Sequence, residues 1–316
     1  MNEKVQHKVL ASSDPSGVFA AYFISLSLPV SNVEFMFKHG EIKDQSFDMI
    51  VDSTPVGDYK GYVFDSHQFK PKDEKSLPYK YKFFETPTAY GIADMFKEKI
   101  KQEDLWKVIG ACVLEGRYDL ISGSILENDK RLLERTVTTY QKYKQETIET
   151  FTYPVYLRLS SPITSLCMVN EPRMAFDLLS YVEEPADLIF NKAVAGAKNT
   201  INEGVRVAVE NSRTIDLDAY AFMVIQVPEK FSDITQIRME DALSYRLMQK
   251  MNKTVAVYNP YTRRGSVSGP LSLPILKALI DKKKAYGYGK TLFSTFYTYK
   301  EELSAGDINI FNNRVQ

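Results

Sequence analysis

Three aspartates close to the ends of short apolar runs are the residues of this chain best suited to chemistry. Asp14, Asp52 and Asp65 each follow a run that is bounded by Gly, Pro or Asp, and His67 lies two residues after the last of them. The carboxyl ends of parallel strands meet at one edge of a sheet, so we expect these four side chains to lie together. Carboxylates with one imidazole suit a divalent cation. Strand-terminal aspartates also serve as turn and capping residues, and the sequence leaves both explanations open.

The elements that must position these residues alternate between strand and helix. Strands are predicted over His7–Ser12, Val33–Lys38, Phe47–Val51 and Gly61–Phe64. Helices are predicted over Gly17–Leu26, Ala89–Ile100, Glu103–Leu114, Asn128–Thr150 and Met174–Val182. This order predicts an α/β domain over residues 1–185, built on a doubly wound, mostly parallel sheet with helices on both faces.

A second, smaller domain is predicted after a long helix of mixed polarity. That helix, over about Asp187–Ser212, is interpreted as a connector spanning residues 186–214. Beyond it, strands are predicted over Tyr220–Val227, Thr254–Tyr258, Ser266–Ser268 and Thr291–Thr298, and helices over Met239–Lys250 and Leu273–Lys284. Residues 215–316 are therefore expected to form an α+β domain, with a cleft between the two lobes.

Composition and charge limit the class of protein. The chain has 316 residues, 44% of them hydrophobic, with only 2 cysteines and 3 histidines, which excludes a disulfide framework and a cysteine-based zinc site. Its longest nearly uncharged run, Pro15–Val33, is broken by Pro29, so we expect a cytoplasmic protein that does not contact a membrane. The 40 basic and 40 acidic side chains cancel overall, but residues 251–300 carry a net charge of +8.

The aspartate spacing resembles the motifs of the DHH phosphoesterases. Their first motif, H-x-D-x-D-G, stands here as Ser12–Gly17, which keeps the first Asp and the Gly. Their second motif, a strand ending in Asp, matches Asp48–Asp52, and their Asp-His-His motif stands as Asp65–His67. The family's fourth acidic position falls at Leu114 or Glu115.

Later segments resemble RecJ-type motifs in the same order. Val169–Ala175 is similar to the segment that carries an Arg before a short helix, and Asn202–Arg206 is similar to the N-x-x-R element of the connector helix. Gly265–Ser268 resembles an S-x-R strand without its Arg, and Gly287–Lys290 resembles a G-G-G-H loop with Lys in place of His.

The departures from these motifs concern the metal ligands. The family's two-metal catalysis needs a full ligand set, and Ser12, Ser16, Ser66 and Leu114 remove about half of it. The ligands that remain would hold at most one manganese or magnesium ion weakly: Asp14, Asp52, Asp65 and His67. No cofactor is otherwise expected.

The basic window offers a second candidate site, for single-stranded nucleic acid. It combines cations, flat aromatic rings and glycines, which follow phosphates, stack on bases and allow close approach. The candidate residues are Arg263, Arg264, Lys282, Lys283, Lys284, Tyr286, Gly287, Tyr288, Gly289 and Lys290. The lysines also fit a plain helix C-terminus followed by a Gly stop, and the two tyrosines also fit a core.

DHH-like proteins that lose catalytic ligands resemble the RecJ-like replication factors of archaea and their eukaryotic helicase-accessory relative. The resemblance implies a catalytically inactive scaffold at the replication fork, associated with GINS and the MCM helicase and contacting single-stranded DNA. The rival hypothesis is a manganese-dependent 5′ exonuclease or small-nucleotide phosphodiesterase that uses the four remaining ligands.

Overall fold

The computed structural model describes most of the chain. The described residues are 6–36, 46–53, 59–66, 80–114, 120, 160–183, 188, 191–217, 219–289, 293–299, 303–304 and 307. Contacts divide the chain into two compact units, unit 1 (Met1–Ala197) and unit 2 (Lys198–Gln316), and the division falls within one helix.

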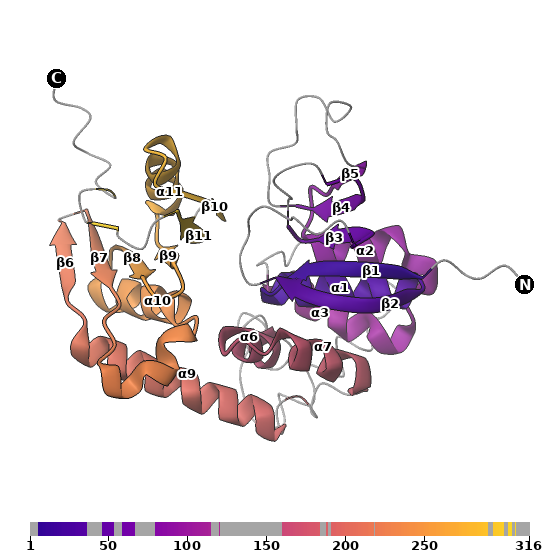
Figure 1. Ribbon diagram of the computed structural model, residues 1–316, viewed down its shortest axis with the longest axis horizontal. Helices are drawn as coiled ribbons and strands as arrows, with labels where there is room; N and C mark the ends of the chain where they lie inside the picture. The colour runs from indigo at the N-terminus through magenta and orange to yellow at the C-terminus, as the bar shows by residue number, and fades with distance from the viewer. Residues whose placement is uncertain are drawn as a thin grey trace, which may run out of the picture. The chain divides into compact units, whose positions relative to one another are not determined.

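Unit 1 is built on a parallel sheet of five strands (Figure 1). The strands are β1 (His7–Ser12), β2 (Val30–Met36), β3 (Met49–Val51), β4 (Tyr62–Asp65) and β5 (Lys80–Phe83). They lie in the order β2-β1-β3-β4-β5, and every neighbouring pair is parallel. The chain therefore moves from β1 to one side and then returns to the other side, which makes the junction of β1 and β3 the topological switch point.

Helices pack against one face of this sheet through a large core cluster. They are α1 (Pro15–Ser27), α2 (Thr88–Met95), α3 (Leu105–Leu114), α6 (Ser161–Met168) and α7 (Pro172–Tyr181). Because successive strand residues point to opposite faces, Val9 and Ala11 join this cluster, while Leu10 joins a smaller one with Ile50 and Val63. The buried face orients β1 and α1, whose junction carries Asp14 and Ser16.

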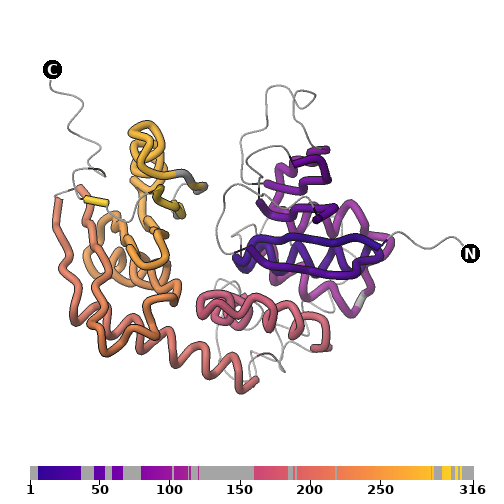
Figure 2. The backbone as a smooth tube through the Cα atoms, viewed as in Figure 1, coloured from indigo at the N-terminus to yellow at the C-terminus, as the bar shows by residue number. Residues whose placement is uncertain are grey.

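Unit 2 contains a mixed sheet in the order β10-β11-β9-β8-β7-β6. Its elements, after α9 (Lys192–Asn211), are β6 (Thr214–Leu217), β7 (Tyr220–Val224), α10 (Glu240–Met251), β8 (Thr254–Asn259), β9 (Arg264–Ser268), α11 (Ser272–Asp281), β10 (Ala285–Gly289) and β11 (Phe293–Thr298). The β7 and β8 strands are parallel and are joined through α10, as a parallel connection requires. The tube in Figure 2 follows this path from α9 to β11.

The fold class expected from the sequence is confirmed: an α/β unit with a parallel sheet and a second, mixed α+β unit. The expected helices on both faces are not seen among the described residues of unit 1, whose helices join the core cluster on one face of the sheet. Elements that were not predicted include β5, α6, β6 and β10. The predicted helix over Asn128–Thr150 lies outside the described residues.

The prediction that Gly287 and Gly289 lie in a loop is wrong, because both belong to strand β10, which pairs with β11. A Cβ on Gly287 would lie 2.2 Å from the carbonyl oxygen of Thr295, so this glycine is needed for close strand packing.

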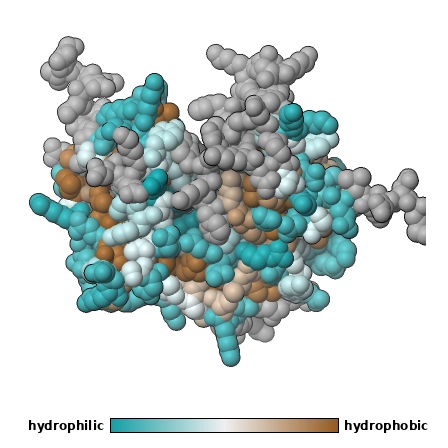
Figure 3. Space-filling view, in the orientation of Figure 1, coloured by the Kyte–Doolittle hydropathy of each residue, from teal (hydrophilic) through white to brown (hydrophobic). Residues whose placement is uncertain are grey.

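The surface visible in Figure 3 is largely hydrophilic, with smaller hydrophobic areas between the polar residues. Within the part of the chain that the structure describes, no helix is both long and apolar enough to cross a bilayer. Both cysteines, Cys112 and Cys167, are buried and unbridged, as expected for a chain without a disulfide framework.

Candidate functional site

The three predicted aspartates lie on adjacent strands at the carboxyl edge of the parallel sheet. Asp14 follows β1, Asp52 follows β3, and Asp65 is the last residue of β4. Since β1 pairs with β3 and β3 pairs with β4, the structure brings their backbones to one edge, at the switch point where ligands bind in open α/β sheets. All three are buried. We call Ser12, Asp14, Ser16, Asp52 and Asp65 the strand-end site.

Ser16 makes a short hydrogen bond within the strand-end site. Its hydroxyl donates to Oδ2 of Asp52 at 2.5 Å, and both residues are buried. Asp52 has a φ of 57°, in the left-handed region that non-glycine residues adopt at an energetic cost. Ser16 stands in place of the second Asp of the first motif. It therefore donates a hydrogen bond to Asp52, the aspartate of the second motif.

Asp14 occupies the N-cap position of α1, but its side chain does not cap the helix. The Ser12 hydroxyl accepts from the Asp14 backbone amide at 3.2 Å and lies 3.4 Å from Oδ2 of Asp14. Gly17, which the motif retains, packs against this turn, where a Cβ would lie 2.3 Å from the Ser12 carbonyl oxygen. The glycine is therefore explained by close packing of α1 on β1.

Asp65 and Ser66 are held by a separate set of hydrogen bonds. The Ser66 backbone amide donates to Oδ1 of Asp65 at 2.8 Å. The Thr88 hydroxyl, at the start of α2, donates to the Ser66 hydroxyl at 2.9 Å. Ser66 stands where the resemblance places a histidine, and its side chain is tied to α2. His67 lies outside the described residues.

The described residues do not form the two-metal centre that the resemblance implies. Among them, no three His, Cys, Asp or Glu side chains lie together in an arrangement that could hold a metal ion. Serine hydroxyls stand at three of the missing ligand positions, and one of them donates to the Asp52 carboxylate. Leu114, at the fourth acidic position, packs against the core, and Glu115 lies outside the described residues.

The two arginines of the RecJ-type segments are paired within their own helices. Arg173, on α7, contacts Asp177 at 3.0 Å. Arg206, on α9, contacts Glu203 at 2.5 Å and Glu210 at 2.8 Å, and these contacts raise its pKa. Both arginines of the RecJ-type segments are therefore engaged by carboxylates of their own helices.

The predicted basic surface separates into exposed and buried parts. Lys283, Lys284 and Arg263 are exposed, and Lys282 is half-buried, at the end of α11. Lys290 lies outside the described residues, as do the side chains of Tyr286 and Tyr288, so both explanations for the tyrosines stay open.

Arg264 was predicted to lie on the nucleic-acid surface, and the structure does not place it there. It is buried, and its guanidinium contacts Glu240 at 2.5 Å and Asp241 at 2.8 Å. Burial raises the pKa of Glu240, and the positive charge of Arg264 opposes that shift. Strand alternation turns Arg264 toward α10 with Ser266 and Ser268, whose hydroxyls lie 3.1 and 2.8 Å from that of Ser244. Arg264 thus fixes α10 on β9.

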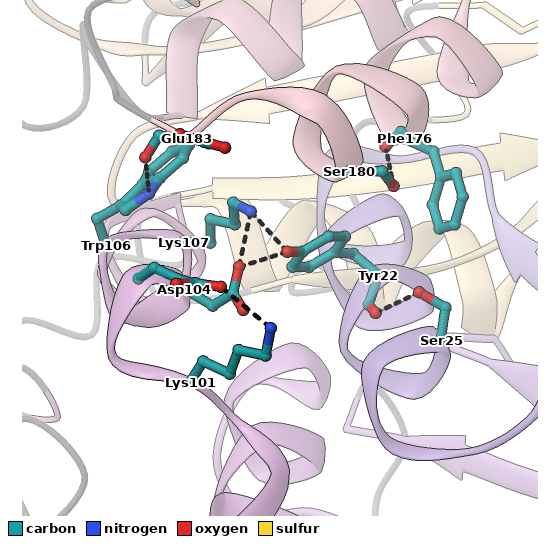
Figure 4. A network of polar contacts seen from close by, with 10 residues as sticks. Tyr22, Ser25, Lys101, Asp104, Trp106, Lys107, Phe176, Ser180 and Glu183 are labelled. Atoms are coloured by element: carbon teal, nitrogen blue, oxygen red, sulfur yellow. Dashed lines mark hydrogen bonds and ion pairs between the residues drawn. The ribbon is translucent and has the colours of Figure 1, made fainter.

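A buried polar cluster in unit 1 was not anticipated (Figure 4). Lys107 contacts Oδ1 of Asp104 at 2.7 Å and the Tyr22 hydroxyl at 2.5 Å, and Tyr22 donates to the same oxygen at 2.5 Å. The indole of the neighbouring Trp106 donates to the Glu183 carbonyl at 3.1 Å. Burial and the charge on Asp104 raise the pKa of Tyr22, so its hydroxyl stays protonated. The signal in the sequence was a lone lysine in an apolar helix, three residues after an aspartate.

The fold of this chain, a parallel α/β unit followed by a mixed-sheet unit, is similar to that of solved RecJ and DHH-domain structures. No protein-family model and no curated protein matches the sequence.

Several solved structures have a similar fold at low sequence identity. RecJ of Thermus thermophilus in complex with Mn²⁺ matches 92% of this chain and 49% of its own, at 12% identity and a TM-score of 0.55. The DHH domain of a member of a family of ribosomal proteins matches 98% of this chain and 86% of its own, at 12% identity and a TM-score of 0.56. An exonuclease RecJ bound to manganese matches 92% and 85%, at 12% identity and a TM-score of 0.52. The chain thus spans about half the length of the Thermus protein.

Proposed function

We propose that this chain is a catalytically inactive DHH-fold scaffold of the DNA replication fork. It associates with GINS and the MCM helicase and contacts single-stranded DNA through unit 2. It needs no cofactor, and the strand-end site retains at most one weakly held manganese or magnesium ion.

The observation that carries the loss of catalysis is the Ser16–Asp52 hydrogen bond of 2.5 Å. A two-metal phosphoesterase activates water and stabilises the transition state with ions held by carboxylates and imidazoles. A serine hydroxyl is neutral and is not readily deprotonated, and here its proton faces the carboxylate that a cation would need. This hydrogen bond supports the proposal that the strand-end site no longer holds the two ions that catalysis needs.

The basic segment, Lys282–Lys284, supports contact with single-stranded DNA. Its three consecutive lysines lie where α11 ends and β10 begins, and Lys283 and Lys284 are exposed. Exposed cations on such a surface follow phosphates without reading base sequence, as a scaffold on a moving strand requires.

A nuclease assay on the purified full chain tests the loss of catalysis. With manganese and a 5′-labelled single strand, we expect no cleavage above background for the wild type, for Asp52→Ala or for Asp48→Ala. Asp48 is the matched control, because it is an exposed aspartate in the same segment. Cleavage by the wild type and Asp48→Ala that Asp52→Ala abolishes would instead establish the exonuclease or phosphodiesterase hypothesis.

The partner proposal is tested separately, with the tagged full chain as bait in native extract. Recovery of GINS or MCM subunits is the expected result. Recovery of neither, from extract in which both are detected, contradicts it.

A further inference from the structure

One aspartate near the C-terminal end of the described chain holds two lysines of the basic segment. The Lys284 ammonium lies 3.0 Å from Oδ1 of Asp307, and the Lys282 ammonium donates to the Asp307 main-chain carbonyl at 2.9 Å. A single residue thus presents two oxygens and one negative charge to two neighbouring ammonium groups. Two oxygens and a negative charge are also what a backbone phosphate presents to a pair of lysines.

Asp307 is itself held in place by a compact turn. Its Oδ2 accepts from the Ser304 hydroxyl at 2.8 Å and from the Ser304 backbone amide at 2.9 Å. The adjacent Leu303 is buried in the core cluster of unit 2. Burial opposes the charge on Asp307, but the Ser304 hydrogen bonds and the Lys284 ammonium outweigh it and hold the pKa of Asp307 below its usual value. The carboxylate is therefore charged at neutral pH and held in one orientation.

The lysines are positioned by the end of α11. Lys283 adopts a left-handed φ of 54°, and the backbone amides of Lys283 and Lys284 donate to the carbonyls of Ile280 and Leu279 at 2.9 Å each. The chain turns there into β10, which lies against α11 (Figure 1). From this turn, Lys282 and Lys284 both reach Asp307, and Lys283 between them is exposed.

We propose that Asp307 competes internally with nucleic-acid phosphate for Lys282 and Lys284, so that a single strand binds this site only by displacing Asp307. This inference rests on the single-stranded DNA contact proposed above. The side chain of Lys284 is 48% exposed and that of Asp307 is 19% exposed, so water and salt reach the pair. An exposed ion pair is weak, and displacing it costs about three- to tenfold in affinity rather than abolishing binding.

The test compares three full-length proteins, wild type, Asp307→Asn and Asp281→Asn, in their affinity for a fluorescent oligothymidylate across a salt series. Asp281→Asn is the matched control, because Asp281 is an exposed acidic residue at the end of α11 and its replacement changes the net charge equally. We expect Asp307→Asn to bind about three- to tenfold more tightly than Asp281→Asn. Its salt dependence should also be steeper than that of Asp281→Asn, because salt weakens the Lys284–Asp307 pair that opposes binding when Asp307 is present.

The outcomes separate this inference from the proposed function. If all three proteins bind equally and Lys282→Ala/Lys284→Ala binds more weakly, the basic segment contacts DNA but Asp307 does not compete for it, and the inference is wrong. If none of the proteins binds the oligonucleotide, the proposed DNA contact fails, and the competition fails with it. Circular dichroism melting of Asp307→Asn verifies that the variant is folded.

Discussion

Unit 1 and unit 2 can be compared through one lysine–aspartate pair in each. Lys107 and Asp104 lie 2.7 Å apart in unit 1, with 5% and 7% of their side chains exposed. Lys284 and Asp307 lie 3.0 Å apart in unit 2, with 48% and 19% exposed. The residue types and distances are similar, so burial is the main difference between the pairs.

That difference separates a fixed contact from a reversible one. In unit 1 the charges are removed from water, and each must keep its partner or remain buried alone, which is costly. In unit 2 water and salt can replace either partner. The strand-end site resembles the first case, since Ser16 and Asp52 are both buried, whereas the basic segment resembles the second. We therefore expect the buried Ser16–Asp52 contact in unit 1 to be fixed and the Lys284–Asp307 contact in unit 2 to be reversible.

The largest effect is expected from Lys107→Met. This change keeps the apolar length of the side chain but leaves the Asp104 carboxylate buried with the Tyr22 hydroxyl and no cation. We expect a loss of about 3–5 kcal/mol in the free energy of unfolding of unit 1. Urea unfolding followed by the fluorescence of Trp106, the chain's single tryptophan, measures it.

The matched control for that variant is Lys101→Met. Lys101 pairs with Glu103 at 3.2 Å, with 73% and 68% of the two side chains exposed. The unfolding midpoint of the Lys101→Met protein should stay close to that of the wild type. A Lys107→Met protein as stable as Lys101→Met would show that burial does not distinguish these pairs.

A smaller effect is expected from Ser16→Ala in the strand-end site. The change removes the donor at 2.5 Å from the buried Asp52 carboxylate and supplies none in its place. We expect a loss of about 1–3 kcal/mol in the free energy of unfolding, measured by the same fluorescence signal. Ser31→Ala is the control, because Ser31 is exposed on β2. If added manganese restored the stability of Ser16→Ala, the carboxylates would still form a cation site, contrary to the proposal that the strand-end site no longer holds the ions that catalysis needs.

The sequence predicted the positions of the aspartates because apolar runs bounded by turn residues define buried parallel strands. It did not predict β5, because Lys80–Phe83 alternates charged and aromatic residues and forms an edge strand with a polar face. It misplaced Gly287, because a glycine needed for strand packing has the same composition signal as one in a loop. It assigned Arg264 to the surface, because its buried partner Glu240 is 24 residues away in the chain.

The smallest effect is expected from Lys284→Met, which breaks the exposed pair with Asp307. We expect a loss of less than about 1 kcal/mol in the free energy of unfolding at low salt, because water can hydrate the Asp307 carboxylate once the ammonium is removed. At 1 M salt the Debye length falls to about 3 Å, so the loss should vanish there, whereas the loss caused by Lys107→Met should persist. Urea unfolding of both variants at low and high salt, followed by circular dichroism, measures the two losses. A salt-independent loss for Lys284→Met would place Asp307 in a fixed contact like that of Asp104, and would make displacement by a single strand costly.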